Sequence, residues 1–192
     1  MEALMRSGHI TGVLDVTTTE LVDELVGGVL SAGPDRLETA GELGLPQVVS
    51  LGSMDIANFG PIDTVPERYR DRTLVVHNPA ITLMRTTPDE CGRLGEIMAA
   101  KLNKARGPLT VFIPKGGISA LAVDGGPFHD PAADDALIGK LKANLDPSIE
   151  VVEEDCDIND HAFATAMAQR LDRHYQEWSK DSGQKRREAK KR

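Results

Sequence analysis

Residues 73–114 read TLVVHNPAITLMRTTPDECGRLGEIMAAKLNKARGPLTVFIP, in which two apolar runs of strand length flank a segment with helical periodicity. Leu74-Val75-Val76 and Val111-Phe112-Ile113 are continuous apolar runs, as expected for strands buried on both faces of a parallel sheet. Between them, Thr87-Pro88-Asp89-Glu90 is a capping box with proline at the first helical position. This order of strand, helix and strand predicts an α/β unit.

The same alternation extends over most of the chain. Strands are predicted at residues 10–16, 47–50, 73–77, 109–114 and 149–152, with a further short strand at 81–85. Helices are predicted at residues 1–8, from Pro34 through Leu37, and after Thr87, Asp130-Pro131 and Asn159-Asp160. We therefore predict one α/β domain over residues 1–178, Rossmann-like, with a mostly parallel sheet flanked by helices.

The formal net charge of −8 is unevenly distributed along the chain. Residues 180–192 carry seven basic and two acidic side chains, a net charge of +5 that leaves −13 on the remainder. Such an acidic body argues against a broad nucleic-acid-binding surface. Residues 179–192 are predicted to form a basic, disordered tail, the one segment that could dock on a nucleic acid or an acidic partner.

Cysteine usage and hydropathy bear on the cellular compartment. Cys91 and Cys156 lie far apart and form no CxxC or Cys/His metal spacing, which predicts two reduced thiols and no metal site. No apolar run approaches the roughly 20 residues that a membrane helix needs, and residues 1–6 lack the layout of a secretion signal. We therefore expect a cytoplasmic protein without membrane contact.

In an open parallel sheet, ligands bind outside the carboxyl ends of the strands, so polar residues that follow predicted strands are candidate contacts. The first such segment is Asp15 to Glu20, which contains the consecutive hydroxyls Thr17, Thr18 and Thr19. These residues could donate to a phosphate or a carboxylate. Alternatively, Thr17 and Glu20 form a capping box, which leaves Asp15, Thr18 and Thr19 without a role.

The second segment contains His77-Asn78-Pro79, followed by Thr82-Leu83-Met84-Arg85-Thr86. His77 ends a strand predicted to be buried, where an imidazole could act as an acid, a base or a ligand contact. Arg85 could clamp an anion with two parallel hydrogen bonds. Alternatively, His77 is a structural group and Arg85 pairs with one of the many carboxylates of the chain.

The third segment follows the strand at 109–114 and contains Gly116, Gly117 and Ser119, then Gly125 to Asp130 with His129. Paired glycines allow a backbone to approach a ligand closely. The segment matches neither GxGxxG nor GxxxxGK[ST], so it is no recognised nucleotide fingerprint. Alternatively, it is a long surface turn in which Asp130 caps the next helix.

Several stretches resemble one family of bacteria, fungi and plants, the tobamovirus-multiplication-inhibitor-like proteins. They are GVLDVTTTEL at 12–21, GGVLSAGPDRLE at 27–38, TVPER at 64–68, HNP at 77–79 with TLMRTT at 82–87, and GGPFHD at 125–130. The resemblance implies two consecutive Rossmann-like domains, a homodimer, and ATP with Mg as cofactor. It assigns this chain to the C-terminal domain and implies an N-terminal domain, labelled ATP-binding, that is missing here. Ala122 and Asp124 depart from the family's pattern of an acidic residue followed by a proline.

The leading hypothesis is a binding domain for a small anionic or nucleotide-like ligand. Its predicted contacts are Asp15, Thr17, Thr18, Thr19, Asn78, Arg85, Thr86, Gly116, Gly117, Ser119, His129 and Asp130. A second hypothesis is an enzyme with His77 or His129 as acid or base and Asp15 or Asp130 as the orienting carboxylate. A third is a non-catalytic regulatory or protein-interaction module.

Overall fold

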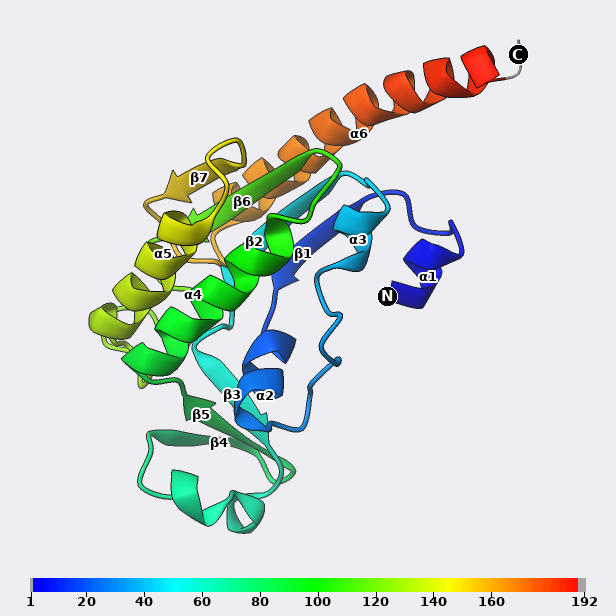
Figure 1. Cartoon of the computed structure of the whole chain (residues 1–192). Coiled ribbons are helices and arrows are strands. Elements are labelled where there is room, and N and C mark those ends of the chain that lie inside the picture. Colours follow the sequence, from blue (N-terminus) through cyan, green and yellow to red (C-terminus); the bar gives the residue numbers. More distant parts are fainter. Residues whose placement is uncertain (1, 190–192) are drawn as a thin grey trace.

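A computed structural model describes residues 2–189, with side chains described through Lys180 (Figure 1). The main sheet has the strand order β1-β2-β6-β7, and every neighbouring pair is parallel. Its strands are β1 (Val13–Thr17), β2 (Gln47–Gly52), β6 (Leu109–Pro114) and β7 (Glu150–Glu154). The predicted Rossmann-like α/β fold with a parallel sheet flanked by helices is confirmed.

The two central strands explain why the apolar runs are continuous. Every residue of β2 and β6 is buried, because alternate side chains enter two different hydrophobic clusters. Val49 and Val111 pack with residues of α4 (Pro88–Leu102) and α5 (Pro131–Asn144). Val48 and Phe112 pack with residues of α6 (His161–Ala189) on the other face. Helices on both faces therefore bury the centre of the sheet.

A second, antiparallel sheet has the order β3-β5-β4 and corrects the placement of the run at 73–77. Its strands are β3 (Ile56–Phe59), β4 (Leu74–Asn78) and β5 (Ile81–Arg85). The strand β4 was predicted to be buried on both faces, but it lies at a sheet edge, where His77 is exposed and Val76 is 56% exposed. Its short connection to β5 forces antiparallel pairing, which the apolar run alone does not reveal. The sequence did not predict the four-residue strand β3.

The helix starts were predicted with mixed success. Thr87 accepts a hydrogen bond from Glu90 N–H at the start of α4, and Asp130 accepts one from Ala133 N–H at the start of α5, as predicted. The capping box at Thr17 is absent, because α2 (Glu20–Val26) begins after Thr19 without a side-chain cap.

Residues 34–38 form turns rather than the predicted helix. Leu37 has a φ of +78°, which breaks helical geometry, and a short helix α3 (Thr39–Glu42) follows. Two 3₁₀ turns, η1 (Ile62–Thr64) and η2 (Glu67–Tyr69), connect β3 to β4.

The two ends of the chain are helical where the structure describes them. Helix α1 (Glu2–Arg6) corresponds to the helix predicted at residues 1–8. Residues 179–189 of the predicted tail continue helix α6, and residues 190–192 of that tail lie outside the described part of the chain. Within residues 2–189, no helix combines the length and the apolar character needed to span a membrane.

Candidate ligand-binding cleft

The second sheet lies beyond the carboxyl ends of the parallel strands (Figure 1). A cleft of 340 Å³ lies between these strand ends and the second sheet. The main sheet contributes residues at the end of β1 and residues that follow the other three strands: Val16, Thr17, Ser53, Ser119, Ala120, Leu121, Ile158 and Asn159. The second sheet contributes the facing wall: Ile56, His77 and Leu83. The cleft therefore occupies the place where ligands bind in open α/β sheets.

A neighbouring recess of 410 Å³ enlarges this cleft toward the hairpin of the second sheet. It shares Ser53, Ile56, His77 and Leu83 with the first cavity. The residues that it adds are Thr19, Leu30, Asn58, Asn78 and Ile81. We call the two cavities together the strand-end cleft.

Ser53 lies between the two cavities in an unusual backbone conformation. Its φ is +58°, in the left-handed region that non-glycine residues seldom adopt. The preceding Gly52 leaves no space for a side chain, since a Cβ there would lie 2.2 Å from the carbonyl oxygen of Val16. The Ser53 N–H donates to the carbonyl of Ile118 at 2.8 Å. These contacts turn the chain sharply from β2 toward β3 and place Ser53 in the cleft.

Asp55, two residues further on, is buried behind the cleft. Its Oδ2 accepts a 2.6 Å hydrogen bond from the Ser119 hydroxyl. Its Oδ1 is buried and has no hydrogen-bond partner among the residues that the structure describes. Burial raises the pKa of Asp55 to about 6, although the Ser119 hydrogen bond and the Arg85 charge oppose this shift.

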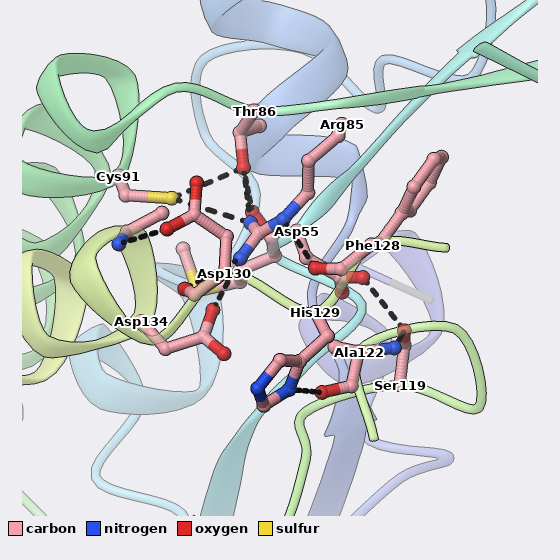
Figure 2. Close-up of polar contacts among 12 residues, drawn as sticks. Asp55, Arg85, Thr86, Cys91, Ser119, Ala122, Phe128, His129, Asp130 and Asp134 are labelled. Carbon is pink, nitrogen blue, oxygen red and sulfur yellow. Dashed lines mark hydrogen bonds and ion pairs between the residues drawn. The ribbon is translucent and has the colours of Figure 1, made fainter. Parts of the chain in front are cut away.

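The guanidinium of Arg85 forms an ion pair and hydrogen bonds with other residues of the chain, as Figure 2 shows. Its Nη2 lies 2.6 Å from Oδ1 of Asp134, and its Nε donates to the carbonyl of Phe128 at 2.8 Å. Its Nη1 donates to the Thr86 hydroxyl at 3.0 Å. Of the two alternatives predicted for Arg85, the structure contains the ion pair with a carboxylate. This ion pair joins β5 to the start of α5.

The residues next to this ion pair also have internal partners. The Asp130 carboxylate caps α5, and its carbonyl accepts from Arg85 at 3.3 Å. The imidazole Nδ1 of His129 lies 3.5 Å from the carbonyl oxygen of Ala122, and its Nε2 lies 3.8 Å from Asp124. Neither His129 nor Asp130 is among the residues that line the cleft.

The three consecutive threonines separate in space. Thr17 lines the main cavity, whereas the buried Thr18 hydroxyl donates to the carbonyl of Ser50 at 3.3 Å. The Thr19 hydroxyl donates to the carbonyl of Ile56 at 2.8 Å at the border of the recess. Thr18 and Thr19 therefore attach the start of α2 to the strands.

Asp15 is buried in an ion pair with Arg36, and its Oδ1 lies 2.6 Å from Arg36 Nη2. Burial raises the pKa of Asp15 despite this cation. Arg36 also lies 3.6 Å from Glu20. Asp15 is not among the residues that line the cleft, so the structure does not bring it together with Thr17 and Ser119.

The paired glycines bring two loops into contact. Gly116 N–H donates to the carbonyl of Cys156 at 2.8 Å, and a Cβ at Gly116 would lie 2.7 Å from the Cys156 carbonyl carbon. Gly117, with a φ of +143°, forms a bridge with Asp157. The loop after β6 therefore packs against the loop after β7, and this contact positions Ser119 and Ile158 at the cleft.

The structure thus brings together part of the predicted site. Thr17, Thr19, Asn78 and Ser119 line the strand-end cleft. The cleft residues that sequence reasoning missed are chiefly Ser53 and Asn159, together with Asp55 behind them. A Gly-Ser pair directly after a buried strand was the available signal for Ser53. Across residues 2–189, no group of three or more His, Cys, Asp or Glu side chains is arranged to hold a metal ion.

The fold and this cleft define a Rossmann-like α/β domain with a cavity at its strand ends. Residues 1–175 match the family described as "Uncharacterised protein family (UPF0261) C-terminal domain", and the chain belongs to this family. It is 49% identical over 172 residues to a UPF0261 protein of Clostridium tetani, covering 89% of this chain and 43% of that protein.

Two further relatives extend the comparison. The UPF0261 protein RA0729 of Rhizobium meliloti is 48% identical over 168 residues, which cover 86% of this chain and 42% of that protein. The ToMV resistance protein Tm-1(GCR237) of Solanum lycopersicum is 40% identical over 169 residues, which cover 87% of this chain and 22% of that protein. These matches confirm the resemblance drawn from the sequence. The chain spans less than half the length of these curated relatives.

Proposed function

We propose that the strand-end cleft binds a small nucleotide-like ligand, and ATP with Mg is the candidate that the family resemblance implies. One observation carries the proposal. The side chains of Thr17, Ser53, His77 and Asn159 line the cleft, and none of them hydrogen-bonds to another described residue. The buried hydroxyls of Thr18 and Ser119 are by contrast hydrogen-bonded within the protein. Polar side chains that line a cavity and have no partner within the protein are available to bind a ligand.

A thermal-shift titration with ATP, with and without Mg, tests this proposal. Saturating binding to the folded state stabilises a protein by about 2.7 kcal/mol at about a hundredfold excess over Kd. Asn159→Ala should reduce this stabilisation by about half or more at the same ligand concentration, whereas Ser179→Ala, at an exposed position of α6, should retain it. Sugar phosphates and small carboxylates complete the panel. A flat response from folded protein to every compound would contradict the proposal.

An enzyme is the second candidate, and the backbone of Ser53 favours it. Strained residues gather at active sites, and Ser53 shares both cavities of the cleft with His77. His77 is therefore the acid or base of this candidate. Asp15 forms an ion pair with Arg36, and the carboxylate of Asp130 caps helix α5. Neither carboxylate therefore orients His77 in this structure. A screen of chromogenic carboxylate and phosphate esters should show turnover that is lost in His77→Gln. Turnover that is unchanged in this variant would exclude His77 from the reaction.

A further inference from the structure

We infer that the strand-end cleft receives the uncharged part of its ligand, a nucleoside or a similarly flat group with hydrogen-bonding edges, and leaves phosphate groups outside. This inference rests on the proposed function and specifies it. It follows from three properties of the cleft: the charge of its lining, the state of its backbone N–H groups, and the chemistry of its walls.

The side chains that line the cleft carry almost no charge. None of the residues that border either cavity is Lys, Arg, Asp or Glu, and His77 is the one side chain there that can gain a positive charge. Phosphate sites in proteins are typically built with guanidinium or ammonium groups. The charge of −13 on the chain before residue 180 adds repulsion of a polyanion.

The cations of the neighbouring segments are already paired. Arg85 is buried and lies 2.6 Å from Asp134. Arg36 lies 2.6 Å from Asp15. Lys115, in the loop after β6, has its Nζ 2.6 Å from a carboxylate oxygen of Asp155. A phosphate in the cleft would have to separate one of these pairs.

Backbone N–H groups are the other means of holding a phosphate, as in Gly-rich loops and helix N-termini. Here several of the N–H groups that follow the strands have partners within the chain. Thr18 N–H donates to Gly52 O, Ser53 N–H to Ile118 O, Leu121 and Ala122 N–H to Ser119 Oγ, and Asn159 N–H to Asp157 Oδ1. These five N–H groups are therefore not available to hold a phosphate.

The walls of the cleft suit a flat and mostly apolar group. Ile56 and Leu83 of the second sheet face Val16, Leu121 and Ile158 of the main sheet segments. Polar residues also line this space, among them Thr17 and Ser53 with their hydroxyls and Asn159 with its amide. An amide offers both donors and an acceptor, which matches the mixed donor and acceptor edge of a nucleobase.

The test compares each of the four neutral ribonucleosides with its 5′-monophosphate and its triphosphate, with Mg, by calorimetric titration of this chain. We expect the nucleoside to bind within about threefold of its phosphorylated forms, and we expect salt to leave the affinity unchanged. Asn159→Ala should weaken nucleoside and triphosphate alike by about tenfold or more, and Ser179→Ala should weaken neither.

Two other outcomes overturn the inference in different ways. If a triphosphate binds more than about tenfold tighter than its nucleoside and weakens with salt, the cleft holds phosphates. In that case the proposed function stands and this inference fails. If Lys115→Ala then weakens the triphosphate and not the nucleoside, the phosphates lie at the loop after β6. If no nucleoside and no nucleotide binds, the proposed function itself fails, and this inference fails with it.

Discussion

The hydroxyl of Ser119 donates a 2.6 Å hydrogen bond to the buried carboxylate of Asp55, across 64 positions of sequence. The same oxygen accepts from the N–H groups of Leu121 and Ala122 at 3.1 Å. Ser119 therefore has its donor and both acceptor positions in use. This arrangement holds the loop after β6 against the segment that joins the two sheets, and so it fixes one wall of the cleft.

Asp55→Asn should change how stability depends on pH. The pKa of Asp55 is raised from 3.8 to about 6, so the folded protein binds this proton more tightly than the unfolded chain. The stability from this proton is fully present below pH 3.8 and is lost as pH rises through about 6. We therefore expect the variant to gain on the wild type by about 2 to 3 kcal/mol between these pH values. Urea unfolding across this range measures the gain, and parallel pH profiles would exclude Asp55 as its source.

Removing one partner of the buried ion pair between Arg85 and Asp134 should destabilise the fold strongly. Asp134→Asn leaves the Arg85 guanidinium, which is 5% exposed, without its counter-charge. We expect a loss of about 3 kcal/mol in the free energy of unfolding. The exposed pair between Arg70 and Glu67 is the matched control, and Glu67→Gln should cost less than about 1 kcal/mol. Equal small losses in both variants would contradict the buried ion pair.

Gly52→Ala tests the close packing at the end of β2. The added Cβ would lie 2.2 Å from Val16 O and 2.4 Å from Ile158 Cδ1, so backbone must move to admit it. We expect a loss of about 3 kcal/mol or more. Gly139→Ala is the control, because nothing lies within 4 Å of its added Cβ inside helix α5. It should stabilise the protein by about 0.5 to 1 kcal/mol. Thermal unfolding compares the two.

The effect of a substitution at Ser53 on stability should depend on how well the new residue tolerates a positive φ. A β-branched side chain is poorly tolerated at a φ of +58°, so Ser53→Val should destabilise the fold by about 1 to 2 kcal/mol. Ser53→Gly should retain most of the stability, because glycine adopts positive φ without steric cost. Chemical denaturation ranks the two variants. A valine variant as stable as the glycine variant would show that the left-handed conformation is not maintained.

The main sheet could be predicted because its signals are local. The apolar run of β2, the apolar run of β6 and the capping box at Thr87 are each contained in a few consecutive residues. The sheet to which β4 belongs could not be predicted in the same way. An apolar run indicates that a strand is buried, but it does not show with which strand it pairs. In β4 the apolar run predicted burial wrongly, since Val76 is 56% exposed.

The candidate site was partly predictable for a related reason. The rule that ligands bind at the carboxyl ends of parallel strands selected Thr17 and Ser119, and both residues line the cleft. It could not identify Asp55, because an aspartate in a sequence is by default a solvated group. The burial of Asp55 depends on Ser119, which folding brings to it from another loop. The positive φ of Ser53 likewise depends on the contact with Ile118.

The two sheets share no strand, yet each supplies one wall of the same cavity. The exposed edge strand β4 and its turn to β5 can therefore change without altering any pairing in the parallel sheet. Exposed connections tolerate change far better than a core strand such as β5, whose Met84 lies in the main hydrophobic cluster. Changes in this part of the second sheet can thus alter which ligands the cleft accepts, while the parallel sheet that forms the other wall stays the same.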